Sequence, residues 1–486
     1  MFLFFALKKF VDYCQVVVKC VLEGTEMDNL WLLTEERPKL SVIIQIINMY
    51  CEDFDDEYYE NDIRIMPIFK NQKFTFTYKV EGLYVNNANN IFIKTVSGSS
   101  SFIDFLLFKQ VNEPIEGSTK DNLIMAIEET KTSDDESRNT GVYQRGSKFV
   151  FISPYYDNVK LYMLYNEELE AREDKKPSDT SIFGTNILLT LGVTVIGKDV
   201  SKWFGKFNTL DDLIAFKANM RKPPQGNVPI TIVKDDSKIT ISGRLAKPAE
   251  AGNIGHDPNI GALSMIAACI RKLGWNKPIE ITLHGVSQEY VNKTRGKNKF
   301  LYICNILDIQ LSGIEMPAVV SLPEQYWHYE FSSEKMASIL LHLSLLYKNC
   351  YTVYENHAGC ERGYFKDLSG NQITLPKKAT DGNNLLIPDV VIYNELTKDI
   401  LLVEGKKLST MYDGINEIKL YDRIEEDYIK KFYPDSKVLR CVSIFGGKRT
   451  GHLHDDVLIY LNEYGEVYLN PKSPSFVIDA FNELAK

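Results

Sequence analysis

Apolar residues recur along the chain both in short runs bounded by polar turns and in longer helical stretches, which predicts a mixed α/β (α+β) fold. In the first part of the chain, strand-like runs cover 74–80, 90–96, 102–108, 123–130 and 149–153. Helices are expected near the two ends of this part, one over 38–50 and one through LDDLIAFKANM. Asn208, a residue type common at helix starts, is expected to cap the second.

A proline- and glycine-containing stretch, RKPPQGN at 221–227, predicts a linker because it stops a helix and offers nothing to bury. Together with the length of 486 residues, it predicts several domains. We expect an N-terminal domain over 1–221, a middle region over 228–320 and a C-terminal domain over 321–486.

The middle and C-terminal parts carry their own local patterns. PITIVKDDSKITISG predicts a hairpin, followed by a helix with Asp257 as N-cap, Pro258 at its first position and Gly274 at its end. The C-terminal part predicts a helix capped by Ser332 or Ser333 and running to 348, then strands over 385–393, 399–406 and 438–445. Each end of the chain is therefore expected to fold as a mixed central sheet flanked by helices.

The charge and the cysteines restrict the function classes only mildly. A net charge of −9 argues against a surface coated in positive charge for non-specific nucleic-acid binding, but an acidic protein can still carry a basic groove. The eight cysteines are scattered without a CxxC pair, which favours reduced thiols and a cytoplasmic location.

The opening MFLFFAL has too few apolar residues for a membrane span, and its lysines follow the apolar run where a signal peptide has them before it. No membrane association is therefore expected. Met27 is an alternative natural start, which would make 1–26 an upstream extension.

The segment LLIPDVVIYNELTKDILLVEGKK gathers the most informative charged residues. Two apolar runs flank the polar turn 394–398, which predicts a buried β-hairpin. If the turn centres between Leu396 and Thr397, Asp389 lies directly across from Glu404, close enough for both to hold one divalent cation. Lys406, two residues after Glu404, leaves the same face of the strand.

Context distinguishes this hairpin from the other [DE]xK matches in the chain, for example Asp236 with Lys238. Burying two carboxylates and an ammonium at the end of apolar strands costs several kcal/mol unless they are paired or bind a metal. The alternative is a plain surface hairpin with an ion pair, although the continuous apolar run in ILLVEGKK is unfavourable for a strand on the surface.

Pro388-Asp389 followed by Glu404-Gly405-Lys406 resembles the PD-(D/E)XK motif of restriction endonucleases and related DNA-cutting enzymes. The resemblance covers about 330–450. It implies a Mg²⁺-dependent endonuclease in which Asp389 and Glu404 hold the metal ion and Lys406 serves the attacking water.

The first part of the chain offers a second trio, Asp104, Glu129 and Lys131, again on two apolar runs joined by a loop. Asp104 lies about as far before the middle of this loop as Glu129 lies after it, so the two are expected to face each other, and Lys131 shares a strand face with Glu129. Asp104 and Glu129 would hold metal, and Glu128 competes with Glu129 for that place. Isoleucine stands where the family motif has proline, and the loop is longer. A decayed or purely structural hairpin is the alternative.

Basic residues elsewhere are candidates for DNA contacts. In the family, a helix after the motif commonly supplies such contacts, which would use Arg138, Gln144, Arg145 and Lys148 in the first part and Glu417, Lys419 and Tyr421 in the last. In the middle region, Lys293, Arg295, Lys297 and Lys299 alternate with Tyr290, Phe300 and Tyr302, a pattern that could grip phosphates and stack on bases. A solvent-exposed helix face or loop explains that pattern equally well.

Two nuclease domains in one chain resemble type II restriction enzymes, often of the type IIS kind, that use a different site for each DNA strand. The resemblance implies sequence-specific cleavage of double-stranded DNA to 5′-phosphate and 3′-hydroxyl ends, a partner DNA methyltransferase and action as a monomer or homodimer. Two alternatives stay open: a PD-(D/E)XK nuclease of repair, transposition or defence, and a non-catalytic DNA-binding protein with decayed nuclease folds.

Overall fold

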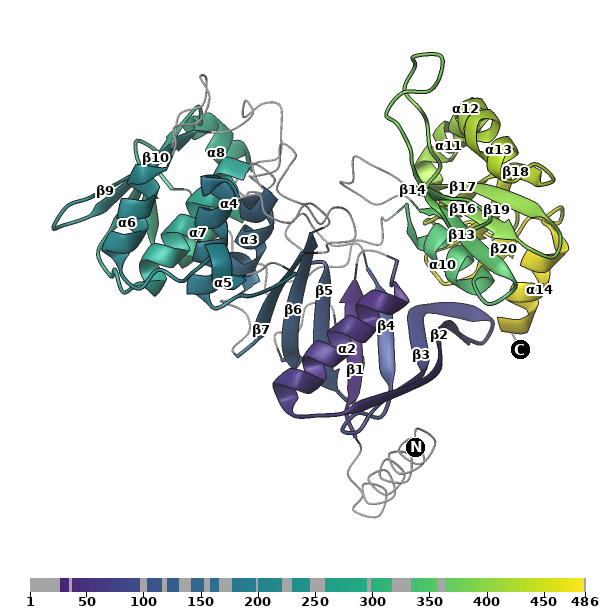
Figure 1. The fold of residues 1–486 in the computed structure, drawn as a ribbon, viewed down its shortest axis with the longest axis horizontal. Coiled ribbons are helices and arrows are strands. Elements are labelled where there is room, and N and C mark those ends of the chain that lie inside the picture. The colour runs from purple at the N-terminus through teal and green to yellow at the C-terminus, as the bar shows by residue number, and fades with distance from the viewer. Residues whose placement is uncertain are drawn as a thin grey trace. The chain divides into compact units, whose positions relative to one another are not determined.

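The computed structural model describes residues 27–34, 37–96, 103–115, 120–130, 141–152, 158–165, 177–197, 200–220, 230–244, 258–294, 299–316, 334–355 and 364–484 (Figure 1). The chain forms two compact units by internal contacts. Unit 1 combines Met1–Ser97 with Glu330–Lys486, and unit 2 is Gly98–Tyr329. The division by function into 1–221, 228–320 and 321–486 stays a prediction.

The C-terminal part of unit 1 is built on a six-stranded sheet in the order β13-β16-β17-β18-β19-β20. The β13-β16-β17 pairs and the β19-β20 pair are antiparallel, whereas β17-β18-β19 run parallel. The strands are β13 (Cys350–Glu355), β16 (Val390–Asn394), β17 (Asp399–Lys407), β18 (Lys437–Phe445), β19 (Val457–Leu461) and β20 (Val467–Leu469). A small separate ribbon pairs β14 (Tyr364–Lys366) with β15 (Gln372–Thr374).

Helices cover this sheet because its central strands are apolar on both faces, as strands of a parallel sheet usually are. Helix α10 (Met336–Leu345) contacts β16, β17, β18 and β19, and α14 (Ser475–Leu484) packs beside α10. The parallel connection from β17 to β18 consists mostly of short helices. It comprises η4 (Leu408–Thr410), α11 (Met411–Glu417), η5 (Ile418–Leu420), α12 (Asp422–Ile424), η6 (Glu425–Ile429) and α13 (Lys430–Phe432).

The N-terminal part of unit 1 contributes strands in the order β2-β3-β4-β1 and one helix. These elements are β1 (Asn29–Thr34), α2 (Leu40–Phe54), β2 (Tyr58–Lys70), β3 (Lys73–Val85) and β4 (Ile91–Thr95). Polar contacts that tie them to the C-terminal part include a hydrogen bond from the Ile65 amide to the Tyr347 hydroxyl at 2.8 Å and a bidentate ion pair of Arg37 with Glu355.

Unit 2 contains strands in the order β5-β6-β7-β8, of which β5-β6 is antiparallel and β6-β7-β8 parallel. Their bounds are β5 (Phe105–Gln110), β6 (Leu123–Thr130), β7 (Lys160–Tyr165) and β8 (Thr194–Ile196). The helices of this part are α3 (Gly141–Ile152), α4 (Asp179–Leu191), α5 (Val200–Trp203) and α6 (Leu210–Asn219).

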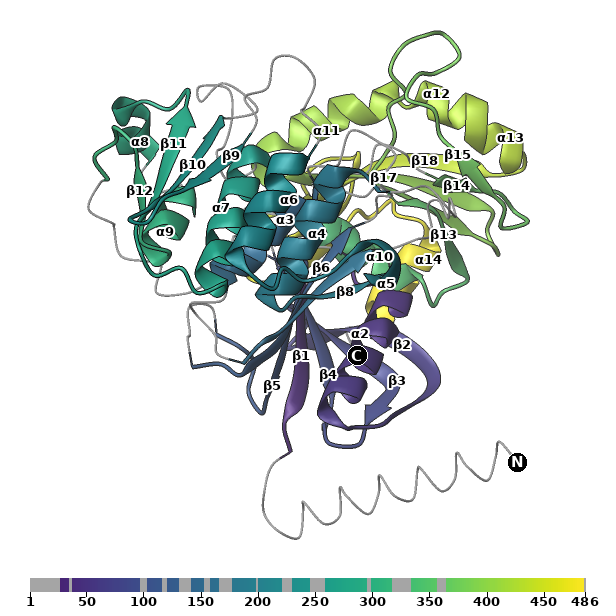
Figure 2. The same cartoon turned by 60° about the vertical axis from the view of Figure 1, so that its left-hand side comes forward.

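The rest of unit 2 is a four-stranded sheet in the order β12-β11-β10-β9, with β9 (Thr231–Lys234), β10 (Ile239–Arg244), β11 (Ile279–His284) and β12 (Ile309–Leu311). Its helices are α7 (Pro258–Lys272), α8 (Gln288–Thr294) and α9 (Lys299–Ile306). Helices α3, α4 and α7 lie side by side (Figure 2). Gly261 makes the close approach possible, since a Cβ there would lie 2.4 Å from the Tyr143 carbonyl oxygen.

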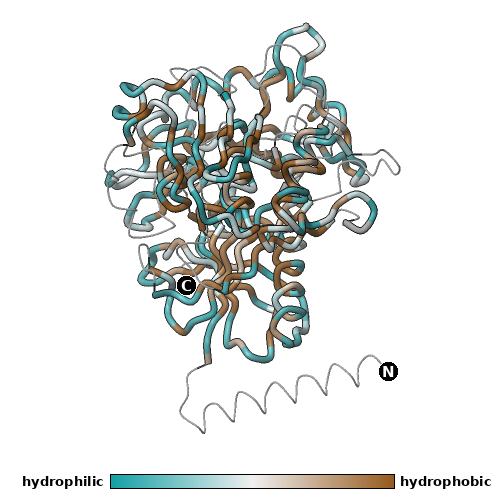
Figure 3. Tube along the Cα trace, turned by 90° about the vertical axis from the view of Figure 1, so that its left-hand side faces the viewer, coloured by the Kyte–Doolittle hydropathy of each residue, from teal (hydrophilic) through white to brown (hydrophobic). Residues whose placement is uncertain are grey.

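The mixed α/β class expected from the sequence is confirmed. In Figure 3 hydrophobic and hydrophilic stretches alternate along the trace, and many turns between elements are hydrophilic. Within the described ranges, no helix has the length and apolar character needed to span a membrane. Five of the cysteines lie in these ranges, and all five are buried free thiols: Cys51, Cys269, Cys304, Cys350 and Cys441.

Several local predictions can be compared with the structure. Helix α7 begins at Pro258 as predicted, and the hairpin of β9 and β10 is present. The cap of α6 is Thr209 and not Asn208, because Thr209 and Asp212 form a reciprocal capping box. Helix α10 begins later than expected, after Lys335. The predicted linker 221–227, Asp257, Ser332, Ser333 and the question of a start at Met27 involve residues outside the described ranges.

The predicted strand over 149–153 is wrong, because its described residues form the last turn of α3. All four described residues of this run, Phe149 to Ile152, are buried. A helix turn that is buried on every side shows no helical periodicity, so a short apolar run does not distinguish it from a buried strand.

We expect His342 to make unit 1 sensitive to acid. Its Nε2 lies 2.6 Å from the Thr352 hydroxyl, its Nδ1 has no hydrogen-bond partner among the described residues, and burial lowers its pKa to about 3. The unfolded chain takes up this proton near pH 6.5, so stability should be full above that pH. It should fall by up to about 1.4 kcal/mol per pH unit as the pH drops towards 3. Urea denaturation of wild type and His342→Gln at pH 7 and pH 5 measures the effect.

The glutamine can keep a hydrogen bond to Thr352 but cannot titrate, so its free energy of unfolding should depend less on pH than that of wild type. An equal pH dependence in both proteins would show that His342 is not responsible.

Candidate active site

The hairpin of β16 and β17 brings Asp389 and Glu404 together. Val390 pairs with Val403, and the same register continued by one residue places Asp389 opposite Glu404, as the sequence predicts. The Asp389 Oδ2 atom accepts a hydrogen bond from the Gly405 amide at 2.9 Å. The aspartate is therefore anchored to the backbone immediately after the glutamate.

Both carboxyl groups lie in an environment that disfavours their charge. Glu404 is 5% exposed. Burial, and secondly the nearby Asp389 carboxylate, raise the pKa of Glu404 to about 7. Burial also raises the pKa of Asp389, although the Gly405 amide opposes the shift. A cation held between the two carboxylates would offset this repulsion.

Lys406 contacts the same carboxylate. Its Nζ lies 2.5 Å from Glu404 Oε1 and 3.0 Å from Glu417 Oε2. Burial alone would lower the pKa of Lys406, but the hydrogen bonds to Glu404 and Glu417 outweigh it and raise that pKa above its usual value. The side chain is therefore an ammonium ion beside the carboxylate pair.

The other Glu404 oxygen, Oε2, accepts a hydrogen bond from the Tyr421 hydroxyl. Burial and the Glu404 carboxylate raise the pKa of that hydroxyl, which keeps it a donor. Of the residues proposed from the sequence after this trio, Glu417 and Tyr421 thus reach the site. Lys419 is exposed, and its Nζ lies 3.4 Å from Asn416 Oδ1.

Two glycines let neighbouring elements approach the trio closely. A Cβ at Gly405 would lie 2.8 Å from the Glu334 carbonyl oxygen, next to the start of α10, and 3.2 Å from Asp389 Oδ2. A Cβ at Gly414 in α11 would lie 2.6 Å from Lys406 Cγ. Small residues at these positions allow α10 and α11 to hold the trio from two sides.

The donor set fits Mg²⁺, which prefers hard oxygen ligands and usually keeps several water molecules. Asp389 and Glu404 supply carboxylate oxygens that repel one another in the absence of a cation. Among the described residues, no group of three or more His, Cys, Asp or Glu side chains could hold an ion. Water and a substrate phosphate would therefore have to complete the coordination.

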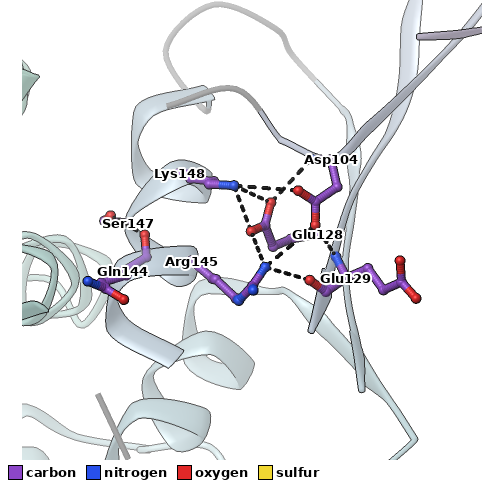
Figure 4. A network of polar contacts seen from close by, with 7 residues as sticks. All are labelled: Asp104, Glu128, Glu129, Gln144, Arg145, Ser147 and Lys148. Carbon is purple, nitrogen blue, oxygen red and sulfur yellow. Dashed lines mark hydrogen bonds and ion pairs between the residues drawn. The ribbon is translucent and has the colours of Figure 1, made fainter. Parts of the chain in front are cut away.

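The second predicted trio is only partly brought together. Phe105 pairs with Ile127, and this register continued by one residue places Asp104 opposite Glu128. The expectation that Glu129 lies across from Asp104 is off by one position, and a shift of one residue reverses the face of a strand. The Glu129 side chain points away from Asp104 in Figure 4. Lys131 lies outside the described residues.

The residues proposed from the sequence for DNA contacts after the second trio lie in different environments. Arg145 and Lys148 both contact Glu128, so the structure places them beside a carboxylate and not on an open surface. Gln144 is exposed on α3 and directed away from Glu128 (Figure 4). Arg138 lies outside the described residues.

The basic and aromatic stretch of the middle region is divided in the structure. Lys293 is exposed on α8, Lys299 is the first residue of α9, and Arg295 and Lys297 lie outside the described residues. Phe300 and Tyr302 are buried. Their rings pack in the core of unit 2, so these two aromatics cannot stack on bases in this conformation.

One residue near the trio of unit 1 was not expected. The Glu334 carboxylate, just before α10, opposes ionisation of Asp389 and adds to the raised pKa of that group. No sequence signal identified it, because its proximity depends on how α10 packs against β17.

Comparisons of the chain with protein-family models, curated proteins and solved structures found no match.

Proposed function

We propose that the chain is a Mg²⁺-dependent endonuclease of the PD-(D/E)XK type that hydrolyses phosphodiester bonds of double-stranded DNA. The observation that carries this proposal is the register of β16 and β17, which puts Asp389 opposite Glu404 while Lys406 contacts the same carboxylate. A buried carboxylate facing a partly buried one, with an ammonium beside them, is costly for a purely structural hairpin. They suit a site that holds a metal ion against a phosphate.

In this proposal Asp389 and Glu404 hold the Mg²⁺ ion, which when bound lowers the pKa of a water molecule and offsets charge on the phosphate. Glu404 is held in position by the Tyr421 hydroxyl, and Asp389 by the Gly405 amide. The raised pKa of Lys406 favours a charged side chain that orients water and stabilises the developing negative charge. Hydrolysis would leave 5′-phosphate and 3′-hydroxyl ends.

Sequence-specific cleavage, as by a type II restriction enzyme with a partner methyltransferase, is the form of this activity that the motif resemblance supports best. A nuclease of repair, transposition or defence would use the same trio without a fixed target sequence. A non-catalytic DNA-binding protein could retain the same fold without cutting.

Incubation of the purified protein with phage DNA and Mg²⁺, followed by mapping of the fragment ends, tests the proposal. Discrete fragments whose ends share one sequence context would support a restriction enzyme. Cleavage without a shared sequence would favour the other nucleases. Intact DNA under every Mg²⁺ concentration tried would contradict the catalytic proposal.

A further inference from the structure

The hairpin of β5 and β6 in unit 2 repeats a specific backbone contact of the site in unit 1. Asp104 Oδ2 accepts a hydrogen bond from the Glu129 amide at 2.8 Å, as Asp389 Oδ2 does from the Gly405 amide at 2.9 Å. In both hairpins the aspartate is thus anchored to the amide that directly follows a glutamate on the opposite strand. The counterpart of Glu404 in unit 2 is therefore Glu128.

The elements that follow the two hairpins also correspond. Strand β6 pairs in parallel with β7, and β17 pairs in parallel with β18. A helix lies between the paired strands in each case, α3 in unit 2 and α11 in unit 1. The correspondence therefore extends over a hairpin, a helix and a parallel strand.

The lysine comes from a different element in unit 2. The position two residues after Glu128 is Thr130, where unit 1 has Lys406 after Glu404. Lys148 of α3 instead places its Nζ 2.7 and 2.8 Å from the two Glu128 carboxylate oxygens and 3.7 Å from Asp104 Oδ1 (Figure 4). An ammonium therefore lies beside the carboxylate pair in both units.

We propose that Asp104, Glu128 and Lys148 form a second metal-dependent site for phosphodiester hydrolysis, in which the lysine is supplied by helix α3 and not by the strand. This inference rests on the function proposed for the chain. It replaces Glu129 and Lys131 with residues that the structure brings to Asp104.

Arg145 is a positioning residue in this site. Its Nη1 donates to Glu128 Oε1 at 3.0 Å and to the Glu129 carbonyl at 2.6 Å, and it lies 3.6 Å from Asp104 Oδ2. It thereby links α3 to the end of β6. The close packing of α3 on α7 further restricts the position of Lys148, since a Cβ at Gly146 would lie 2.5 Å from Met265 Sδ.

A structural ion-pair network is the competing explanation, and two features argue against it. Asp104 adds a second carboxylate beside Glu128, which a structural pair does not need. The cluster is also accessible from one side, because the Asp104 and Lys148 side chains are 20% and 19% exposed while that of Glu128 is fully buried.

The first experiment counts bound Mn²⁺ ions by titration calorimetry, which requires no DNA cleavage. Glu128→Gln should bind one Mn²⁺ fewer per chain than wild type. The matched control, Glu129→Gln, changes the neighbouring glutamate on the opposite strand face and should bind as many as wild type. Equal Mn²⁺ stoichiometry in wild type and Glu128→Gln would overturn the proposal. If Glu128→Gln does not fold, Asp104→Asn serves for the same comparison because its side chain is partly exposed.

The second experiment assigns the lysine by plasmid cleavage. Lys148→Met should convert supercoiled plasmid to nicked circles, and Lys131→Met should convert it to the linear form. The reverse pattern would overturn the assignment to Lys148. Failure of the proposed function would give a different result from failure of this inference. Wild type would then leave the plasmid intact, whatever number of Mn²⁺ ions it binds. Failure of this inference alone would leave plasmid cleavage intact and Mn²⁺ binding unchanged in Glu128→Gln.

Discussion

Replacing Lys406 with alanine should lower the rate of double-strand DNA cleavage by at least about 100-fold, the lower range for loss of a group that assists proton transfer or orients water. Its ammonium lies 2.5 Å from Glu404 Oε1, and its stem packs closely against α11, since a Cβ at Gly414 would lie 2.6 Å from Lys406 Cγ. The fold should persist, because the lysine contributes its charge to the site and little to the core. Single-turnover cleavage of plasmid DNA in Mg²⁺ measures the rate.

The matched control is Lys407→Ala, because that lysine is adjacent in sequence and leaves the opposite face of β17. It should cut at nearly the wild-type rate. DNA binding in Ca²⁺, measured by gel mobility shift, should remain in both variants. Similar rates for wild type and Lys406→Ala would remove this lysine from the mechanism.

Disabling one site at a time should convert the enzyme into two different nickases. Asp389→Asn removes a carboxylate from the site of unit 1, and Asp104→Asn removes the corresponding one from unit 2. The strands of a duplex are antiparallel, so their scissile phosphates have opposite polarity. One fixed site therefore cannot attack both without rebinding or a partner subunit. Nicked circles should accumulate with each variant, and sequencing from the nicks should place them on opposite strands.

Clean double-strand breaks by Asp104→Asn would show that the carboxylates of unit 2 are structural. The enzyme would then have to dimerise or cut twice through Asp389, Glu404 and Lys406. Complete loss of cleavage in either variant would show that the two sites depend on each other.

The hairpin of unit 1 could be predicted because its turn is short and its strands pair regularly up to Val390 and Val403. Counting outward from the turn then places Asp389 opposite Glu404. In unit 2 the same counting fails by one residue. The connection from Gln110 to Leu123 is long, and the pairing of β5 and β6 is irregular between Leu107 and Phe108. The middle of that connection therefore does not fix which residues face each other.

Lys148 could not be assigned from the sequence for a related reason. The buried run from Phe149 to Ile152 was interpreted as a strand, although it completes α3. That interpretation left out the last turn of the helix that brings Lys148 to Glu128. Contacts of this kind depend on tertiary packing, as does the Tyr421 hydrogen bond to Glu404, and spacing along the chain does not specify them.

The most direct test of the catalytic claim compares wild type, Glu404→Gln and Glu395→Gln in converting supercoiled plasmid to the linear form in Mg²⁺. Glu395 is exposed at the other end of the same hairpin and is the matched carboxylate control. We predict that wild type and Glu395→Gln produce linear DNA whose ends DNA ligase rejoins without prior kinase treatment, whereas Glu404→Gln produces none. Linear DNA forming at the same rate with Glu404→Gln as with wild type would contradict the assignment of the active site to Asp389, Glu404 and Lys406.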